Sequence, residues 1–115
     1  MTVTKVPDAA GRARIRDGVH VEVSPRRVRA YFDNHLVADS QNVLLVFETK
    51  RPPVYWFPVA DVRMNLLARK EPAADAASGT VRWRSNTGGR IADNLAWSYS
   101  EPSGDLAPLE GHIAF

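Results

Sequence analysis

The sequence predicts an all-β domain of about seven to nine short strands, arranged as a barrel or as a pair of packed antiparallel sheets. Three observations support this class. Apolar and polar residues alternate over residues 27–32 and again over residues 79–86. The unbroken apolar run at residues 43–47 has the length and the β-branched composition of a well-covered strand. Turn-forming residues separate these segments at short intervals, so at most short helical turns are expected.

The length of 115 residues suits one domain with one core. We divide the chain into an N-terminal basic arm, residues 1–25, and a single β domain, residues 26–115. The arm is assigned because its small, polar and basic residues show little periodicity. The chain contains no cysteine, which excludes disulfides, thiolate nucleophiles and the common cysteine-ligated zinc and iron–sulfur sites.

The first predicted strands form a hairpin. Apolar residues take one face of the extended segment at residues 27–32, and arginines and a tyrosine take the other. Asp33 and Asn34 tolerate left-handed backbone angles, so they predict a tight turn into a second strand at residues 35–40. Residues 43–47 then predict a central strand that is covered on both faces.

The rest of the chain predicts short strands joined by turns and loops. Further strands are expected at residues 54–57, 62–68, 79–86, 90–93, 95–99 and 112–115. Between them we expect a proline loop at residues 49–53, a tight turn at 59–61, an exposed loop at 69–78, a turn at 87–89 and a helical turn at 106–109. In the strand at residues 62–68, the alternation of Val62, Met64 and Leu66 predicts that these side chains face the core.

The histidines and glycines form no recognised metal or phosphate motif. His20, His35 and His112 lie far apart in the sequence and have no carboxylate at ligand spacing. Gly88 and Gly89 lack the lysine and serine of a phosphate-binding loop, so they predict a turn. We therefore expect no metal site and no cofactor.

Several carboxylates stand next to predicted strands. Asp39 ends an apolar segment, Asp61 precedes another, and Asp93 adjoins Asn94. Two of them can meet across a sheet and act as general acid and base. The structural alternative is that they cap turns and pair with arginines such as Arg63. Residue types alone leave both interpretations open, and they identify no catalytic residue.

Aromatic residues are the strongest functional signal. They outnumber what one small core needs, and strict alternation sends Tyr55 and Trp56 to opposite faces of their strand. Some of the rings are therefore expected to line a groove, a pocket or an interface. The alternative is a core whose aromatic residues leave their polar tips in water. The set comprises Tyr31, Tyr55, Trp56, Phe57, Trp83, Trp97 and Tyr99.

Charge and hydropathy restrict the partners. The formal net charge is +2, and arginines crowd the first quarter of the chain. That patch is compatible with an anionic partner, but the small net charge and the missing RNA-binding pattern argue against a nucleic acid. No apolar run approaches the roughly 20 residues that a membrane span needs. We expect no membrane partner, and a cytoplasmic location is the simplest inference.

Three ordered motifs resemble a known family. The runs RVRAYFDNHLVADS, PPVYWFPVADVRMNLL and GGRIADNLAWSYSEP, with the closing GHIAF, are similar to the bacterial DUF427 family, also labelled NTP_transf_9. The resemblance covers about residues 28–115. It implies a small β domain like the β-tent group of Mss4 and methionine sulfoxide reductase. The family has no established activity, and the motif of a nucleotidyltransferase, a Gly-Ser pair with clustered aspartates, is missing here.

The chain departs from the family pattern in three places. Relatives usually have glycines in the turn that Asp33 and Asn34 form here. Many relatives carry a Cys-Pro-Tyr-Lys-Gly type of segment where this chain has residues 74–79, so a thiol and a lysine are absent. Relatives also continue past Phe115 into a further strand. This difference implies an unfinished edge at the C-terminus, which would allow self-association or pairing with a second tandem domain.

The resemblance also implies a set of site residues. The family motifs fall on Asp39, on Tyr55, Phe57, Asp61 and Arg63, and on Asn94, Trp97 and Tyr99. We expect the four rings at positions 55, 57, 97 and 99 to wall a pocket for a small-molecule ligand. Arg63 would bind a carboxylate or phosphate, and Asp61 would orient the ligand or accept a hydrogen bond from it.

Three classes of function remain open at this point. The first is a domain that binds a small polar or anionic ligand in an aromatic-walled pocket. The second is an enzyme that uses Asp39 or Asp61 as acid or base, or that carries out the chemistry of the nucleotidyltransferase label. The third is a module that binds protein or nucleic acid through its arginine-rich arm and open edge.

Overall fold

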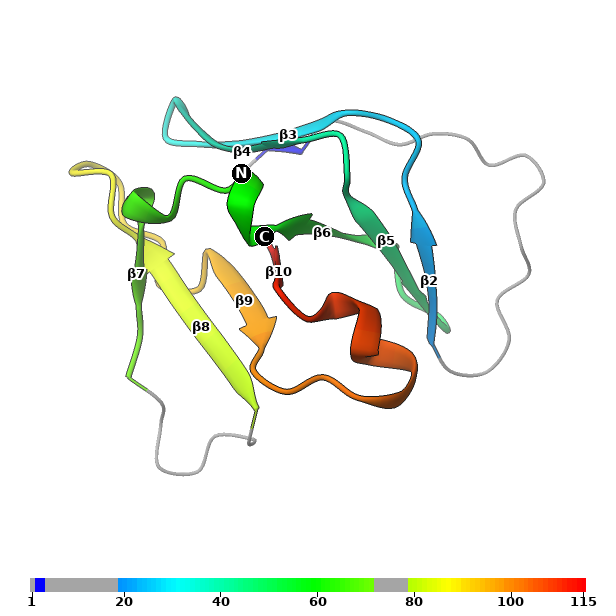
Figure 1. The fold of residues 1–115 in the computed structure, drawn as a ribbon. Helices are drawn as coiled ribbons and strands as arrows, with labels where there is room; N and C mark the ends of the chain where they lie inside the picture. Colours follow the sequence, from blue (N-terminus) through cyan, green and yellow to red (C-terminus); the bar gives the residue numbers. More distant parts are fainter. Residues whose placement is uncertain (1, 4–18, 72–78) are drawn as a thin grey trace.

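The computed structural model describes residues 2–3, 19–71 and 79–115, which form two antiparallel sheets (Figure 1). The small sheet has the strand order β1-β3-β4, and the large sheet has the order β2-β5-β6-β10-β9-β8-β7. Their bounds are β1 Thr2–Val3, β2 Val19–Val23, β3 Val28–Phe32, β4 His35–Ser40, β5 Leu44–Glu48, β6 Val54–Pro58, β7 Leu67–Arg69, β8 Thr80–Ser85, β9 Ala96–Tyr99 and β10 His112–Ala114.

The all-β class is confirmed, and the arrangement is the pair of packed sheets. The helical segments of the described chain are short 3₁₀ turns: η1 Val59–Asp61, η2 Met64–Leu66 and η3 Gly104–Leu109. The large sheet ends at β2 and β7, which do not pair with each other, so the described residues form no closed barrel. Within those residues there is also no helix of the length and hydropathy that crossing a membrane requires.

The predicted first hairpin is confirmed. Asp33 and Asn34 have φ angles of 53° and 63°, so both central residues of the turn are left-handed. This is the backbone of a type I′ turn, whose twist matches that of the two flanking strands. The Asp33 carboxylate also accepts hydrogen bonds from the Thr87 hydroxyl (3.1 Å) and from the Arg90 amide (2.9 Å). The hairpin tip is thereby tied to the glycine-containing turn that follows β8.

Two predicted strands are wrong. The segment at residues 62–68 begins with a single bridge at Val62, continues into η2 and reaches β7 only at Leu67. Val62 is buried in the core and Met64 and Leu66 pack against it, as predicted, but Met64 and Leu66 do so from a 3₁₀ turn and not from an alternating strand. Residues 90–93 form no strand because Ser85 Oγ donates to the Arg90 carbonyl (3.0 Å) and accepts from the Ala92 amide (2.8 Å). A side chain thus satisfies backbone groups that a strand would pair.

The N-terminal part of the chain differs from the expected arm. Residues Val19–Val23 form β2, which pairs antiparallel with β5 over five residue pairs. The alternation of valine with His20 and Glu22 is a strand pattern, and Val19 and Val21 pack against a core. Residues 1 and 4–18 of the arm lie outside the described residues, as does the 72–78 portion of the expected loop.

The last strand is central rather than exposed at an edge. β10 pairs with β6 on one side and with β9 on the other. The open edge expected at the C-terminus is therefore wrong, because the outer strands of the large sheet are β2 and β7. Self-association and a tandem second domain remain predictions.

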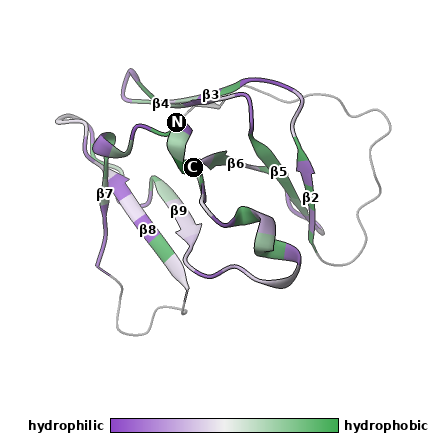
Figure 2. Ribbon diagram, in the orientation of Figure 1, coloured by the Kyte–Doolittle hydropathy of each residue, from purple (hydrophilic) through white to green (hydrophobic). Residues whose placement is uncertain are grey.

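The two faces of the large sheet bury different cores. One core contains Phe57 and Ile113 and lies where the small sheet and its connections cover the large sheet. The other contains Trp56 and Leu109, and η3 covers it. Figure 2 shows hydrophobic residues concentrated on β5 and β6, whereas β8 alternates between the two colours. The second core is thus covered by a single short element, which leaves part of this face open.

Candidate functional site

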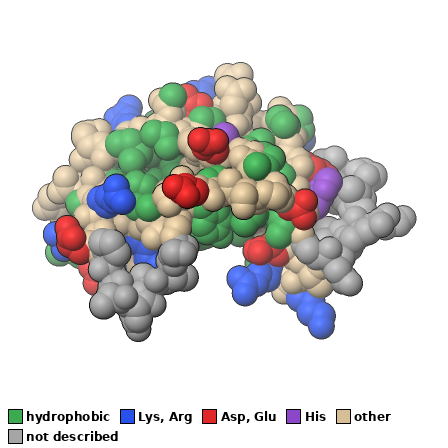
Figure 3. Space-filling view, turned by 60° about the horizontal axis from the view of Figure 1, so that its bottom comes forward, with side chains coloured by type: hydrophobic (Ala, Val, Ile, Leu, Met, Phe, Trp, Pro, Cys, Tyr) green, Lys and Arg blue, Asp and Glu red, His purple; other side chains and the backbone are tan. Residues whose placement is uncertain are grey.

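A cavity of about 470 Å³ lies on the face of the large sheet that η3 only partly covers. Its walls come from β5, β6, β9, η3 and the loop that joins β5 to β6. Figure 3 shows hydrophobic side chains at the centre of the η3 side of the molecule, with charged side chains among and around them. The cavity is lined by Val46, Glu48, Arg51, Pro52, Pro53, Val54, Trp56, Trp97, Tyr99, Leu106 and Leu109.

Strand register brings the three aromatic residues of this cavity together. Ala114 of β10 is the pairing partner of both Trp56 on β6 and Trp97 on β9. The side chains of Trp56, Ala114 and Trp97 therefore project from the same face of the sheet in one row. The small alanine leaves room above it. The two indole rings meet edge to face at 6.1 Å, and the Tyr99 ring lies 5.2 Å from that of Trp56. Both arrangements are favourable for aromatic pairs.

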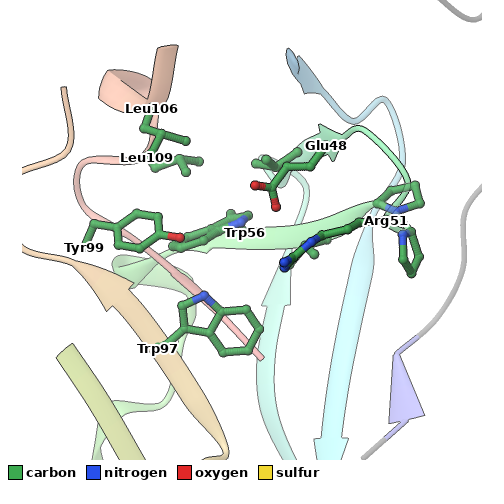
Figure 4. Close-up of a pocket in the computed structure, with 11 residues that line it drawn as sticks. Glu48, Arg51, Trp56, Trp97, Tyr99, Leu106 and Leu109 are labelled. Atoms are coloured by element: carbon green, nitrogen blue, oxygen red, sulfur yellow. The ribbon is translucent and has the colours of Figure 1, made fainter. Parts of the chain in front are cut away.

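The polar tips in the cavity have no protein partner among the described residues. Neither the indole nitrogen of Trp97 nor the hydroxyl of Tyr99 makes a hydrogen bond there. Figure 4 shows both atoms at the cavity, with the Tyr99 hydroxyl pointing across it toward Trp56. A ligand in the cavity would therefore find an apolar floor and two free hydrogen-bonding groups.

Charges of both signs stand at the cavity mouth. Glu48 ends β5 and Arg51 follows three residues later, and Figure 4 shows both side chains pointing toward the cavity. The turn between them is closed by a hydrogen bond from the Arg51 amide to the Glu48 carbonyl (3.1 Å). Within the described residues neither side chain forms an ion pair or a hydrogen bond.

The predicted aromatic wall is divided between the two faces of the sheet. Trp97 and Tyr99 line the cavity, but Tyr55 and Phe57 do not. Phe57 is completely buried in the core beneath the small sheet, and Tyr55 packs against that core. The hydroxyl of Tyr55 is buried without a partner among the described residues, and burial raises the pKa of Tyr55 to about 12. Trp56, between them on β6, takes the expected place in the wall.

The predicted polar pair is also not brought to the aromatic cavity. Arg63 is exposed and does not line it. Asp61 is half-buried and accepts a hydrogen bond from the Ser40 hydroxyl (2.6 Å). It lines a separate hollow of about 300 Å³ that also includes Asp39 and Arg27. Residues two apart in a strand would share a face, but η1 ends at Asp61 and turns the chain there.

Asp39 is engaged in a structural ion pair. Its carboxylate accepts two hydrogen bonds from the Arg27 guanidinium, at 2.7 and 2.6 Å, and Arg29 lies 3.6 Å away. The hydrogen bonds from Arg27 hold the pKa of Asp39 below its usual value, so this carboxyl is poorly suited to donate a proton. Asn94, the last predicted residue, is exposed and accepts a hydrogen bond from the Lys70 ammonium (3.1 Å).

Sequence reasoning missed three kinds of lining residue. Trp56 was in the aromatic set, but only the pairing partners show that it shares a face with Trp97. Arg51 stands in the predicted loop at residues 49–53 and Glu48 directly precedes it, where no periodicity indicates direction. Leu106 and Leu109 come from a short 3₁₀ turn far along the chain, and no signal in the sequence relates them to β6.

A metal site of the usual composition is not formed by the described residues, among which no three His, Asp or Glu side chains gather. The family relationship is clear. Residues 20–115 match NTP_transf_9, described as a domain of unknown function (DUF427). The chain belongs to the DUF427 family. The match begins inside β2, so this DUF427 domain includes the outer strand that we had assigned to an arm.

The match assigns the chain to a family and supplies no activity. The described strands of the DUF427 domain from β2 to β10 lie within the match, apart from the first residue of β2. A search of curated proteins found no match. The chemistry of the DUF427 domain must therefore be argued from its own cavity.

Proposed function

We propose that this DUF427 domain binds a small polar ligand that carries an anionic group and a flat or apolar body. The body would lie against Trp56, Trp97 and Tyr99, and the anionic group would meet the Arg51 guanidinium. The observation that supports the proposal most is the cavity itself, about 470 Å³ in volume, with a ring-lined floor. This volume falls within the range of small-molecule sites in proteins.

The physical chemistry of the lining supports this class of ligand. Aromatic faces bind planar or apolar groups with little loss of side-chain freedom. A guanidinium offers a fork of N–H donors that matches a carboxylate or a phosphate. Arg51 has no ion pair among the described residues, so its donors are free for a ligand. The hydroxyl of Tyr99 and the indole N–H of Trp97 provide further directional contacts.

The test is a thermal-shift screen of the full chain against ring-containing carboxylates and phosphates, followed by calorimetric titration of each compound that stabilises it. A ligand at a hundredfold excess over its Kd should add about 2.7 kcal/mol to the free energy of unfolding. Trp97→Ala and Arg51→Ala should each weaken binding by about tenfold or more. Trp97→Phe keeps an aromatic ring and should lose less affinity than Trp97→Ala. Comparing the two variants shows whether the alanine variant fails only because it misfolds.

Two further arginine variants locate the site. Arg69→Ala removes an exposed arginine from β7 and should leave affinity unchanged. Arg63→Ala tests the position that the family motifs implied, and it too should leave affinity unchanged if the aromatic cavity is the site. Binding that depends on Arg63 and is indifferent to both Arg51 and Trp97 would refute the proposal. Failure of every compound in the screen would count against it as well.

A further inference from the structure

The Glu48 carboxylate stands at the same cavity mouth as Arg51. An anionic ligand bound to Arg51 would bring a second negative charge close to Glu48. Like charges at short range oppose each other, and Glu48 is half-buried, where solvent screens less than in bulk water. A purely anionic ligand therefore satisfies one of the two charged groups at the mouth and is repelled by the other.

The backbone between Glu48 and Arg51 forms a closed turn. Lys50 has a φ angle of 64°, and the Arg51 amide closes the turn on the Glu48 carbonyl at 3.1 Å. Arg51 also precedes Pro52, which restricts the Arg51 backbone to extended angles. Elsewhere in the chain, Arg27 and Asp39 pair at 2.6 Å across neighbouring segments of the small sheet. Glu48 and Arg51 form no such pair, and both project toward the cavity (Figure 4).

The aromatic floor suits a cation as well as an apolar group. The faces of tryptophan and tyrosine attract ammonium groups through their quadrupoles, most strongly where water is excluded. Trp56 is only 2% exposed and forms the deepest part of this floor. An ammonium near Glu48 would thus meet a carboxylate on one side and ring faces on the other.

We infer that the ligand is a zwitterion of the amino-acid class: Glu48 pairs with its ammonium group, Arg51 pairs with its carboxylate, and Trp56, Trp97 and Tyr99 hold its side chain. This inference rests on the proposed function and adds the charge pattern of the ligand. A zwitterion leaves neither mouth charge facing a like charge and pairs each with its opposite. Specificity then comes from repulsion of simple anions and simple cations as much as from attraction.

Three matched probes separate these possibilities. Phenylalanine carries both charges, 3-phenylpropionate lacks the ammonium group, and phenethylamine lacks the carboxylate. Calorimetric titration of the full chain at low ionic strength should show that phenylalanine binds about tenfold more tightly than either analogue. Glu48→Gln should abolish the preference for phenylalanine over 3-phenylpropionate. Arg51→Gln should abolish the preference over phenethylamine. Both substitutions keep size and polarity, and Arg69→Gln serves as the control that should change neither preference.

The outcomes distinguish this inference from the proposed function. If 3-phenylpropionate binds as tightly as phenylalanine and Glu48→Gln is without effect, the ligand is a simple anion; the zwitterion is then refuted while the proposed function stands. Equal binding of phenethylamine, or no binding of any of the three probes, also refutes the zwitterion. If all three probes bind and Trp97→Ala and Arg51→Gln alter none of them, the binding lies elsewhere, and both the inference and the proposed function fail.

Discussion

At the scale of single residues, one strand shows how position decides chemistry. On β6, Trp56 faces the open cavity and its neighbour Tyr55 faces the closed core. The two rings are adjacent in sequence and similar in polarity. Only the face to which each is directed makes one a candidate ligand contact and the other a buried side chain with an unpaired hydroxyl.

That buried hydroxyl leads to a prediction about Tyr55→Phe. Removing an unpaired buried hydroxyl without changing the shape of the ring should raise the free energy of unfolding by about 1 kcal/mol at neutral pH. Burial raises the pKa of Tyr55 to about 12, above the ordinary value of 10.0. Folding thus favours the neutral phenol. The free energy of unfolding of the wild type is unaffected by this ionisation below about pH 10 and falls as the pH rises toward 12.

Urea denaturation of the wild type and of Tyr55→Phe at several pH values measures both effects. The stability advantage of the variant should widen between pH 10 and pH 12, because only the wild type carries the phenol with the raised pKa. Binding of any cavity ligand should be unchanged. A variant that is less stable at neutral pH would show that the hydroxyl has a favourable partner.

At the scale of elements, side chains set the ends and directions of strands. The β3–β4 hairpin and the loop after β8 lie 54 residues apart in sequence, yet the Asp33 carboxylate joins them through Thr87 Oγ1 (3.1 Å). The Asp33 carboxylate also accepts a hydrogen bond from the Arg90 amide. The Ser85 hydroxyl donates a hydrogen bond to the Arg90 carbonyl and accepts one from the Ala92 amide, so residues 90–93 bend instead of forming a strand. The junction depends on close approach at Gly89, where an added Cβ would lie 2.5 Å from the Asp33 carboxylate oxygen.

Gly89→Ala should therefore destabilise the protein by about 1–2 kcal/mol, because the new methyl group would push the Asp33 carboxylate away from its two donors. A double-mutant cycle with Asp33→Ala measures this by urea denaturation. In the Asp33→Ala background the alanine at position 89 should be nearly neutral, since the obstructing carboxylate is gone. Additive effects of the two substitutions would show that the junction is not the cause.

At the scale of the whole molecule, unequal cover of the large sheet creates the candidate site. The small sheet and η2 cover the face that carries Phe57, whereas η3 covers the opposite face and contacts β2 across it. η3 is held down by Leu109, which is completely buried against Trp56 and Ala114. The cavity occupies the part of this face beyond η3 (Figure 4).

Leu109→Ala should destabilise the protein by about 2–4 kcal/mol, the range expected when a fully buried leucine is truncated. It should also weaken any cavity ligand, because the wall that η3 provides would loosen. Leu106→Ala is the matched comparison: Leu106 lines the same cavity but is only partly buried, so its stability loss should be smaller. Urea denaturation and ligand titration measure the two effects. Equal stability losses would indicate that Leu109 does not anchor η3.

The sequence by itself determined the all-β class, the left-handed turn at Asp33 and Asn34, most of the strands and the family. These features depend on local backbone preference and on the period of two, which a sequence displays directly. It also showed that Tyr55 and Trp56 must face opposite ways. It did not determine which of them shares a face with Trp97, because that depends on how β6 and β9 pair with β10.

Tertiary structure alone decided the composition of the site. Trp56, Glu48, Arg51 and Leu109 meet at one cavity because β10 inserts its small Ala114 between two distant strands and η3 folds back over them. The expected partnership of Asp61 and Arg63 with the rings did not form, since 3₁₀ turns interrupt the strand that would have carried them. Periodicity is a property of neighbours along the chain, whereas a cavity is made by residues that only sheet register and cover bring together.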